Sequence, residues 1–461
     1  MSRFIGDKQF YKTVLGIAAP IMIQNGISNF VNLLDNLMVG QLGTEPMSGV
    51  AIVNQIMFIY FLCIFGGLAG AGIYTAQYFG SRNEEGIRQT FRFKIWLGFI
   101  LTALSITLLY FQGDNLISLY LNEGSEGSDL AATLEYGSGY MRILFFGLPF
   151  LFMNIAYSST IRECGKTVLP MVSGIIAVFV NLIFNWLLIF GNLGFPELGV
   201  KGAAIATDIS RAVEFLVLLI WVHSHGKVYP YIKGLYRTML VPFDKAFKFM
   251  ATGTPLLLNE TLWSIGMFLL NRSYSLRGLN VVAGQNISST VNNVFNIAFI
   301  AMGDAVAIII GRLLGAGKLE EARDKDRKMI AFAVFLGFVI MALVLLTSTG
   351  FPELYNTNAE AKLLATRFLI VQAVATPKDA FLHTTYFTLR SGGRTIITFI
   401  FDSVFMFAVS VPAATLLISL TGLGAVTVFA IIHSLDLIKC IIGFIMIKKG
   451  IWVRNIVADK S

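Results

Sequence analysis

Charged residues are scarce in this chain. They make up 13% of its 461 residues, whereas 56% are hydrophobic; a soluble domain averages about 25% charged residues. The segments between the apolar runs are short, which leaves no room for a sizeable soluble domain. Strict alternation of apolar and polar residues, the pattern of a membrane β-barrel, is also lacking. With a mean hydropathy of +0.72, the chain is predicted to be an all-α integral membrane protein.

Cysteines and enzyme motifs are few or missing as well. Cys63, Cys164 and Cys440 have no metal-binding spacing and are expected to be free thiols. The four histidines form neither a zinc motif nor a triad pattern, and the sequence has no nucleotide-binding loop and no GxSxG. The first apolar run is too long for a cleavable signal peptide. These absences argue against an ATP-driven pump or an intramembrane hydrolase, so we expect neither an enzyme nor an organic cofactor.

The chain has twelve long apolar runs instead. A helix rises ~1.5 Å per residue and the hydrocarbon core of a bilayer is ~30 Å thick, so a run of about 20 residues crosses it. We predict twelve transmembrane helices, at residues 13–39, 47–72, 92–112, 134–157, 168–190, 201–223, 246–271, 281–308, 329–350, 364–388, 395–418 and 423–447.

The basic residues are unevenly distributed between these runs. With the N-terminus inside, 26 of the 35 Lys and Arg residues face the same side, in the N-terminal tail and at 80–94, 162–166, 227–248, 312–328, 390–394 and 448–461. The opposite loop at 113–133 has no basic residue; its acids are Asp114, Glu123, Glu126 and Asp129. This positive-inside pattern predicts that both termini are cytoplasmic, and it explains the net charge of +8 without nucleic acid.

The two halves of the chain resemble each other. Residues 235 positions apart match in the pairs Pro20 and Pro255, Gly43 and Gly278, and Gly80 and Gly315; residues 228 apart match in Pro149 and Pro377, Arg162 and Arg390, and Gly165 and Gly393. Six helices in each copy predict two lobes related by a parallel pseudo-two-fold repeat along the membrane normal. The expected divisions are an N-lobe at 1–223, a cytoplasmic linker at 224–245 and a C-lobe at 246–461.

Several segments carry a more specific resemblance. They are DNLMVGQLG (35–43), YFGSRNEEG (78–86) with its copy LLGAGKLEEA (313–322), IRECGKT (161–167) and FGNLGFPELGVKGAAIAT (190–207). In this order and spacing, the chain resembles the multidrug and toxic compound extrusion (MATE) family over essentially its whole length. The resemblance implies an alternating-access carrier with two lobes.

Asp35 lies within the first predicted helix. A charged side chain at the bilayer centre costs roughly 2.5–3.5 kcal/mol on insertion scales. Burial disfavours its ionised form, so a proton or a cation competes for it. The residue matches the family's helix-1 aspartate, which the resemblance implicates in ion or proton coupling. The alternative is a structural acid that forms hydrogen bonds at a helix break.

Glu260 and Asp379 lie five and two residues after the repeat-related prolines of the C-terminal half. Each proline frees a backbone carbonyl one turn earlier, and oxygen ligands suit a hard cation such as Na⁺. Both positions resemble acids of the family's NorM-type branch, which makes them candidates for a Na⁺ and substrate-coupling site. Alternatively, Asp379 merely pairs with Lys378 or His383.

Asn181 and Asn185 are one turn apart in the fifth predicted helix and are expected to form a polar pocket with Asp35. Thr207, on the sixth helix, matches the wall of that pocket in the family. The DinF-type branch carries an acid where this chain has Asn185, which puts a Na⁺ site in the N-lobe in doubt but not a proton on Asp35. Hydrogen bonding between helices is the alternative role for the two asparagines.

Other polar residues are expected to be structural. Asp208, Arg211 and Glu214 are spaced to neutralise one another, as are Asp436 and Lys439. Arg162 and Arg390 are expected to lie in short cytoplasmic turns and to anchor these loops. No role is predicted for Asp304 and Asp402.

The function predicted from these features is secondary active antiport. We expect a plasma-membrane carrier, monomeric and surrounded by lipid, that exports small amphipathic organic cations in exchange for Na⁺ or H⁺. The resemblance of Glu260 and Asp379 to the sodium-coupled branch favours Na⁺. One alternative is a flippase for lipid-linked precursors, which would need basic rather than acidic residues in its cavity. An intramembrane enzyme or a receptor is a more distant alternative, because function is argued from sites and no such site is visible.

Overall fold

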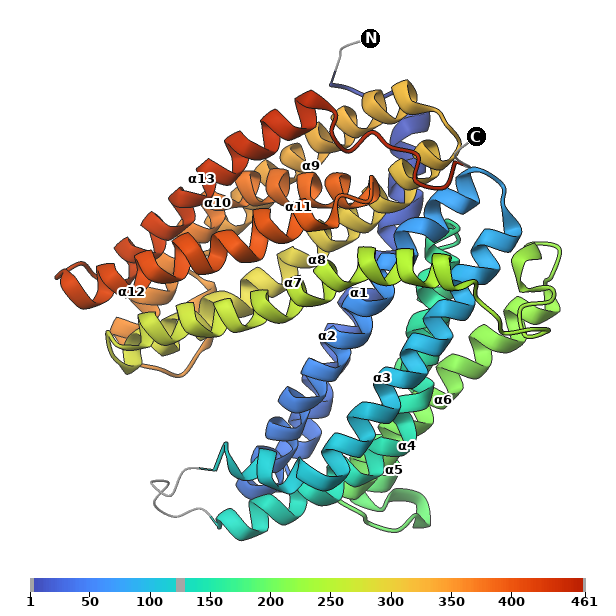
Figure 1. Cartoon of the computed structure of the whole chain (residues 1–461). Helices are drawn as coiled ribbons and strands as arrows, with labels where there is room; N and C mark the ends of the chain where they lie inside the picture. Colours follow the sequence, from blue (N-terminus) through green and yellow to red (C-terminus); the bar gives the residue numbers. More distant parts are fainter. Residues whose placement is uncertain (1–3, 122–128, 459–461) are drawn as a thin grey trace. The chain divides into compact units, whose positions relative to one another are not determined.

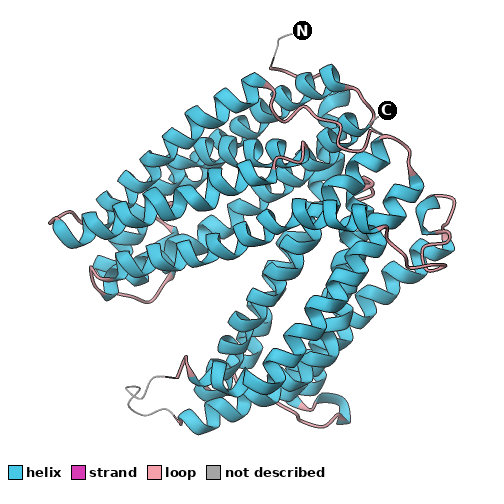
Figure 2. Ribbon diagram, viewed as in Figure 1, coloured by secondary structure: helices cyan, strands magenta, loops and turns pink. Residues whose placement is uncertain are grey.

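The computed structural model describes residues 4–121 and 129–458, so two of the predicted loop acids, Glu123 and Glu126, lie outside the described residues. The described residues form helices joined by short turns and loops (Figures 1 and 2). The long helices are α1 (Lys8–Gly40), α2 (Thr44–Gly80), α3 (Glu84–Ser118), α4 (Leu130–Glu163), α5 (Val168–Phe190), α6 (Val200–Ser224), α7 (Phe243–Ser275), α8 (Leu279–Gly315), α9 (Leu319–Thr347), α10 (Ala359–Ser391) and α13 (Ala425–Lys449).

The eleventh predicted span is not one regular helix. It consists of α11 (Thr395–Phe399), two π-helical turns, η4 (Ile400–Val404) and η5 (Met406–Ser410), and α12 (Val411–Leu420). Pro412 follows the π-helical turns and has no N–H to donate to the carbonyl one α-helical turn before it. A π-helical stretch within a membrane helix is rare and is often found at functional sites. Here it carries Asp402.

All twelve predicted runs fall on helical segments, and the composite segment 395–420 counts as one of them. Among the described residues, nine of the twelve helices are apolar enough over their length to cross a membrane by composition alone. The other three are α6, α7 and α10. These helices carry Thr207, Glu260 and Asp379, so the polar residues predicted for the sites are part of what lowers their hydropathy. Cys63, Cys164 and Cys440 are free, as expected.

Contacts divide the chain into two compact units. Unit 1 contains residues 1–22, 76–82 and 254–461, and unit 2 contains residues 23–75 and 83–253. The division therefore cuts α1 just after Pro20 and α7 just before Pro255. An internal proline removes a helical hydrogen bond, and these two repeat-related positions are where each helix passes from one unit to the other. The lobe boundaries derived from the sequence repeat stay a prediction.

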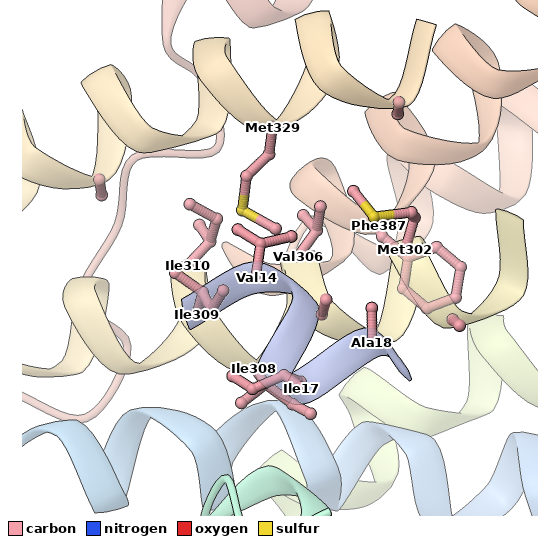
Figure 3. Packing of buried hydrophobic residues seen from close by; sticks show 14 of the residues in the cluster. Val14, Ile17, Ala18, Met302, Val306, Ile308, Ile309, Ile310, Met329 and Phe387 are labelled. Atoms are coloured by element: carbon pink, nitrogen blue, oxygen red, sulfur yellow. The ribbon is translucent and has the colours of Figure 1, made fainter. Parts of the chain in front are cut away.

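The first half of α1 belongs to the core of unit 1. Val14, Ile17 and Ala18 are buried against Val306 and Ile308 of α8 (Figure 3). Further members of this core come from α9, α10 and the C-terminal segment, including Met329, Phe387 and Trp452. Removal of this apolar surface from contact with water or headgroups fixes the N-terminal helix to the C-terminal half of the sequence.

Unit 2 has a separate core. Buried Val50 and Val53 of α2 pack with Leu144 of α4 and Ala204 of α6. The first turns of α7 also belong here, because the Phe249 ring packs edge-on against Tyr74 at 4.9 Å between centroids. Thus each half of the sequence contributes the beginning of its first helix to the other unit.

A close helix crossing in unit 1 involves two glycines that the repeat predicts to be equivalent. A methyl group at Gly80 would meet the backbone of Arg312, and a methyl group at Gly315 would meet the backbone of Gln77. The end of α2 and the end of α8 can approach this closely only because both positions lack a Cβ atom. Gln77 also donates to the carbonyl oxygens of Ser391, at 3.0 Å, and Arg454, at 3.2 Å.

We predict that Gly315→Ala destabilises the protein, because the added methyl group has to push two backbones apart. Overpacking of this kind costs about 1–3 kcal/mol. The change should lower the apparent melting temperature of the purified protein in detergent, measured by tryptophan fluorescence. Gly26→Ala is the matched control, since nothing lies within 4 Å of its added methyl group. Equal melting temperatures for the two variants would contradict the close crossing.

Candidate coupling sites

Asp35 of α1 lies against α5 within unit 2. The Asn185 side-chain nitrogen donates a hydrogen bond of 2.6 Å to Oδ1 of Asp35. Asn181, one turn earlier, completes the contact when its amide nitrogen faces the acid, donating at 2.9 Å to Oδ1 and 3.1 Å to Oδ2. Both asparagines are buried. The structure thus joins the three residues that the sequence places in one pocket, and it surrounds the carboxylate with amide N–H donors.

Thr207 lies near this cluster but does not complete it. Its hydroxyl donates to the carbonyl oxygen of Ala203 at 3.0 Å, within α6. The Tyr140 hydroxyl of α4 lies beside Thr207 and interacts electrostatically with Asp35. It also approaches Oδ1 of Asn54 at 3.5 Å. Tyr140 and Asn54 are therefore additional polar neighbours of the Asp35 cluster, and neither was predicted from the sequence. For Tyr140 the available signal was a tyrosine hydroxyl within an apolar run.

The charged residues of α6 pair as expected. Arg211 and Glu214 form an ion pair at 3.4 Å, and Arg211 interacts electrostatically with both Asp208 and Asp35. Asn154 of α4 donates to the Glu214 carboxylate at 3.1 Å. The only strongly basic group among the residues named around Asp35 is therefore already engaged with acids of its own helix.

Asp379 of α10 is held by a neighbouring lysine within unit 1. The Lys378 ammonium lies 2.6 Å from Oδ1 of Asp379 and 3.0 Å from Oδ2 of Asp436 on α13. This ion pair is the structural alternative foreseen for Asp379; His383, the other partner considered, has no hydrogen bond to it among the described contacts. A cation already bridges two carboxylates at this point.

The pairing continues through a second lysine. Lys439 of α13 lies 3.9 Å from Asp436, the pairing expected from their spacing, and 3.2 Å from Oδ1 of Asp402 in the π-helical turn. The result is a chain of alternating charges, which we call the ion ladder: Asp379, Lys378, Asp436, Lys439 and Asp402. It contains three carboxylates and two ammonium groups, so one negative charge remains when all five are ionised.

Buried Asn259 anchors the far end of the ion ladder. It donates to Oδ2 of Asp402 at 3.2 Å and to the Tyr386 hydroxyl at 3.3 Å. The side-chain oxygen of Asn259, Oδ1, accepts a hydrogen bond of 2.7 Å from the Ser403 hydroxyl. Glu260, the next residue on α7, interacts electrostatically with Arg390 and Asp402. Glu260 and Asp379 thus belong to one polar region through Asp402, but they do not form the direct pair that a shared Na⁺ site would need.

Two expectations about basic residues need correction. Arg390 was expected in a short turn, but it lies in the last turn of α10, is buried, and stacks over the Phe387 ring at 5.3 Å. Arg162 likewise lies in the last turn of α4. The last turns of both helices lie beyond the ends of the apolar runs, so hydropathy alone places these two arginines outside the helices.

Comparison with known proteins agrees with this architecture. The chain matches the MatE family over residues 20–187 and 255–416. It is 24% identical over 415 residues to the probable multidrug resistance protein YoeA of Bacillus subtilis, covering 88% of this chain and 86% of that protein. It is 23% identical over 422 residues to the probable multidrug resistance protein NorM of Thermotoga maritima, covering 90% and 87%.

A solved structure has the same fold. A mutant of the Vibrio cholerae MATE transporter VcmN superposes with a TM-score of 0.85 at 19% identity, over 97% of this chain and 98% of that one. The family match and the apolar helices define a multi-pass membrane transporter rather than an enzyme. The chain belongs to the MatE family, because the family match covers most of its length.

We predict that Asn259→Ala destabilises unit 1, because it removes the amide that donates to Oδ2 of Asp402 and that accepts from the Ser403 hydroxyl. Among the described residues, Asp402 then keeps only Lys439, and Ser403 keeps only the backbone carbonyl of residue 259. Each unsatisfied buried polar group costs about 1–3 kcal/mol. Thermal unfolding in detergent measures the effect. Asn293→Ala, at an exposed position of α8, is the control and should unfold like the wild type. An Asn259→Ala protein of unchanged stability would show that the amide is not a structural anchor.

Proposed function

We propose that the chain is a secondary active antiporter that exports small organic cations in exchange for H⁺ or Na⁺. The proposal rests on half-buried carboxylates inside the helices of both units. Asp35 lies next to the amide of Asn185, and Asp379 lies next to the ammonium group of Lys378. Family membership supports carrier activity, and the names of the two relatives support drug export. Antiport needs only that drug and ion compete for the same acids, so that each shifts the conformational equilibrium by its differential affinity.

The contacts of Asp35 favour a proton as its ligand. Two amide N–H groups face the carboxylate, whereas Na⁺ prefers oxygen ligands. On protonation Asp35 becomes a donor, and an asparagine must then present its carbonyl oxygen. The Oδ1 of Asn185 is buried and has no hydrogen-bond partner among the described residues. Rotation of the Asn185 amide therefore lets its Oδ1 accept a hydrogen bond from the protonated Asp35 carboxyl. This rotation couples the charge of Asp35 to the packing of α1 on α5.

Glu260 is the better place for Na⁺ in unit 1. Beside Asp379, the Lys378 ammonium already lies where a monovalent cation would bind. Glu260, in contrast, has a nearby carboxylate in Asp402 and the carbonyl oxygens of a proline-containing helix. The experiment below distinguishes Na⁺ from H⁺ as the driving ion, because the Na⁺ gradient and the pH gradient are imposed separately.

The positive-inside pattern supports both termini on the cytoplasmic side. Membership of a transporter family supports a carrier of the plasma membrane, and we propose that it acts as a monomer. A lipid-linked phosphate flippase would need basic groups that are free to meet phosphate. Lys378 and Lys439 are instead bound to carboxylates, so organic cations are the better match.

We predict that inverted vesicles containing the wild type take up ethidium when the concentration of the driving ion is higher in the lumen than in the bath. The lumen of an inverted vesicle corresponds to the outside of the cell. A pH gradient and a Na⁺ gradient are tested separately, on the wild type and on Asp35→Asn, Glu260→Gln and Asp379→Asn. Asp35→Asn should lower pH-driven uptake by at least tenfold, because an amide cannot gain or lose the proton. Glu260→Gln should lower any Na⁺-driven uptake by a similar factor.

Exposed acids provide the matched controls. Asp114→Asn and Glu353→Gln remove carboxylates that pair with lysine or arginine at helix ends, and both should transport like the wild type. Uptake driven by neither gradient would refute the antiport proposal. Binding of pyrophosphate lipid in place of ethidium uptake would favour the flippase.

A further inference from the structure

Lys378 lies where an external cation would be expected. Its ammonium contacts one carboxylate of α10 at 2.6 Å and one of α13 at 3.0 Å, and its side chain is only 12% exposed. We propose that Lys378 is a built-in occupant of a cation site formed by Asp379 and Asp436, and that the protonated amine of a substrate takes its place during transport. The role in transport rests on the proposed function, whereas the site itself is tested by binding alone.

The site offers more acceptors than Lys378 uses. His433 of α13 contributes a ring nitrogen, and the donor atoms of Asp379, His433 and Asp436 all lie within 4.8 Å of one another. Nδ1 of His433 is buried and has no hydrogen-bond partner among the described residues. An ammonium group has three N–H donors. Two aspartates and an unprotonated imidazole nitrogen therefore match the donor number of a primary amine.

Charge indicates that one incoming positive charge is the right number. The ion ladder has three carboxylates and two ammonium groups, so it keeps one negative charge while Lys378 and Lys439 remain protonated. A singly charged amine that displaces Lys378 replaces one positive charge by one positive charge, so the net charge of the ion ladder does not change during the exchange. This balance favours a monovalent amine over a metal at the Asp379, His433 and Asp436 cluster.

Exposure indicates which end of the ion ladder exchanges. The Asp379 side chain is 39% exposed, compared with 23% for Asp402 at the other end. Lys439 is also placed over the rings of Phe401 and Phe405, at 5.6 and 5.5 Å, which holds its ammonium by cation–π contact. Lys378 has no such contact among the described residues and has a flexible four-carbon stem. Exchange is therefore expected at Asp379, with Lys439 staying in place.

The chemical class of ligand follows from the two short contacts. Charge-assisted hydrogen bonds to carboxylates need N–H groups on the cation. A quaternary ammonium ion carries the same charge but has no N–H, and its methyl groups keep the charge farther from the oxygens. The site is therefore expected to prefer primary and secondary amines to quaternary cations.

The test is equilibrium binding of n-propylammonium to the purified full-length protein, measured by calorimetry. This probe equals the part of a lysine side chain beyond Cβ, so it fits the space that Lys378→Ala opens. We expect Lys378→Ala to bind it at least tenfold more tightly than the wild type does. Lys362→Ala is the matched control, because Lys362 is on the same helix and pairs with Glu353 at 2.8 Å; it should bind like the wild type. Propyltrimethylammonium should gain less than twofold.

A second variant keeps the test independent of whether Lys378→Ala folds. The wild type should bind n-propylammonium at least tenfold more tightly than propyltrimethylammonium, and Asp436→Asn should abolish this preference. The inference is overturned if Lys378→Ala gains no affinity, if both probes gain equally, or if the wild type shows no preference that Asp436→Asn removes. A protein that exports ethidium but fails these binding tests would retain the proposed function and lose this inference. The reverse result would retain the amine site and refute antiport of ethidium.

Discussion

Charge neutralisation inside an apolar helical bundle is the constraint on which the rest of this structure depends. A carboxylate buried without a partner is strongly destabilising, so acids kept within the helices must find counter-ions or hydrogen-bond donors. In unit 1 the counter-ions are lysines of the chain itself, and the five groups of the ion ladder join α10, α13 and the π-helical turn. In unit 2 the donors are the amides of Asn181 and Asn185. The acids of unit 1 are thus stabilised by ion pairs with lysines, and Asp35 of unit 2 is stabilised by hydrogen bonds from amides.

These solutions have different consequences for transport. An acid surrounded by amides can accept a proton and satisfy it by amide rotation, so Asp35 is suited to H⁺. An acid bridged by an ammonium group keeps a counter-ion when another cation displaces the lysine, so Asp379 is suited to exchange of one cation for another. Both mechanisms leave each acid partnered at every stage. A carrier needs this property, because an unpaired charge in the hydrocarbon region would oppose the change of conformation.

Much of the fold was accessible from the sequence. The length and spacing of the apolar runs predicted the twelve helical spans, and the rarity of acids at that depth singled out Asp35, Glu260 and Asp379. Pairings one turn apart, such as Asp436 with Lys439, were also predictable, because helical periodicity alone brings them together.

The partners that come from distant segments were not predictable. Lys378 meets Asp436 across 58 residues, and Lys439 meets Asp402 across 37. No periodicity relates such positions, so the adjacent pair of Lys378 and Asp379 gave no sign of a ladder. The π-helical turn that aims Asp402 at Lys439 departs from the regular helix that hydropathy predicts. Arg390 was assigned to a turn for a related reason, since apolar runs end before the packed ends of helices do.

The central claim is that organic cation and driving ion compete for the same acids. Equilibrium binding of ethidium to the purified protein, followed by fluorescence over a series of Na⁺ concentrations and pH values, tests it most directly. The account predicts that the apparent Kd for ethidium rises linearly with the concentration of at least one of the two ions, and that this dependence disappears when the responsible acid is neutralised. An apparent Kd that is independent of both Na⁺ and H⁺ would contradict it.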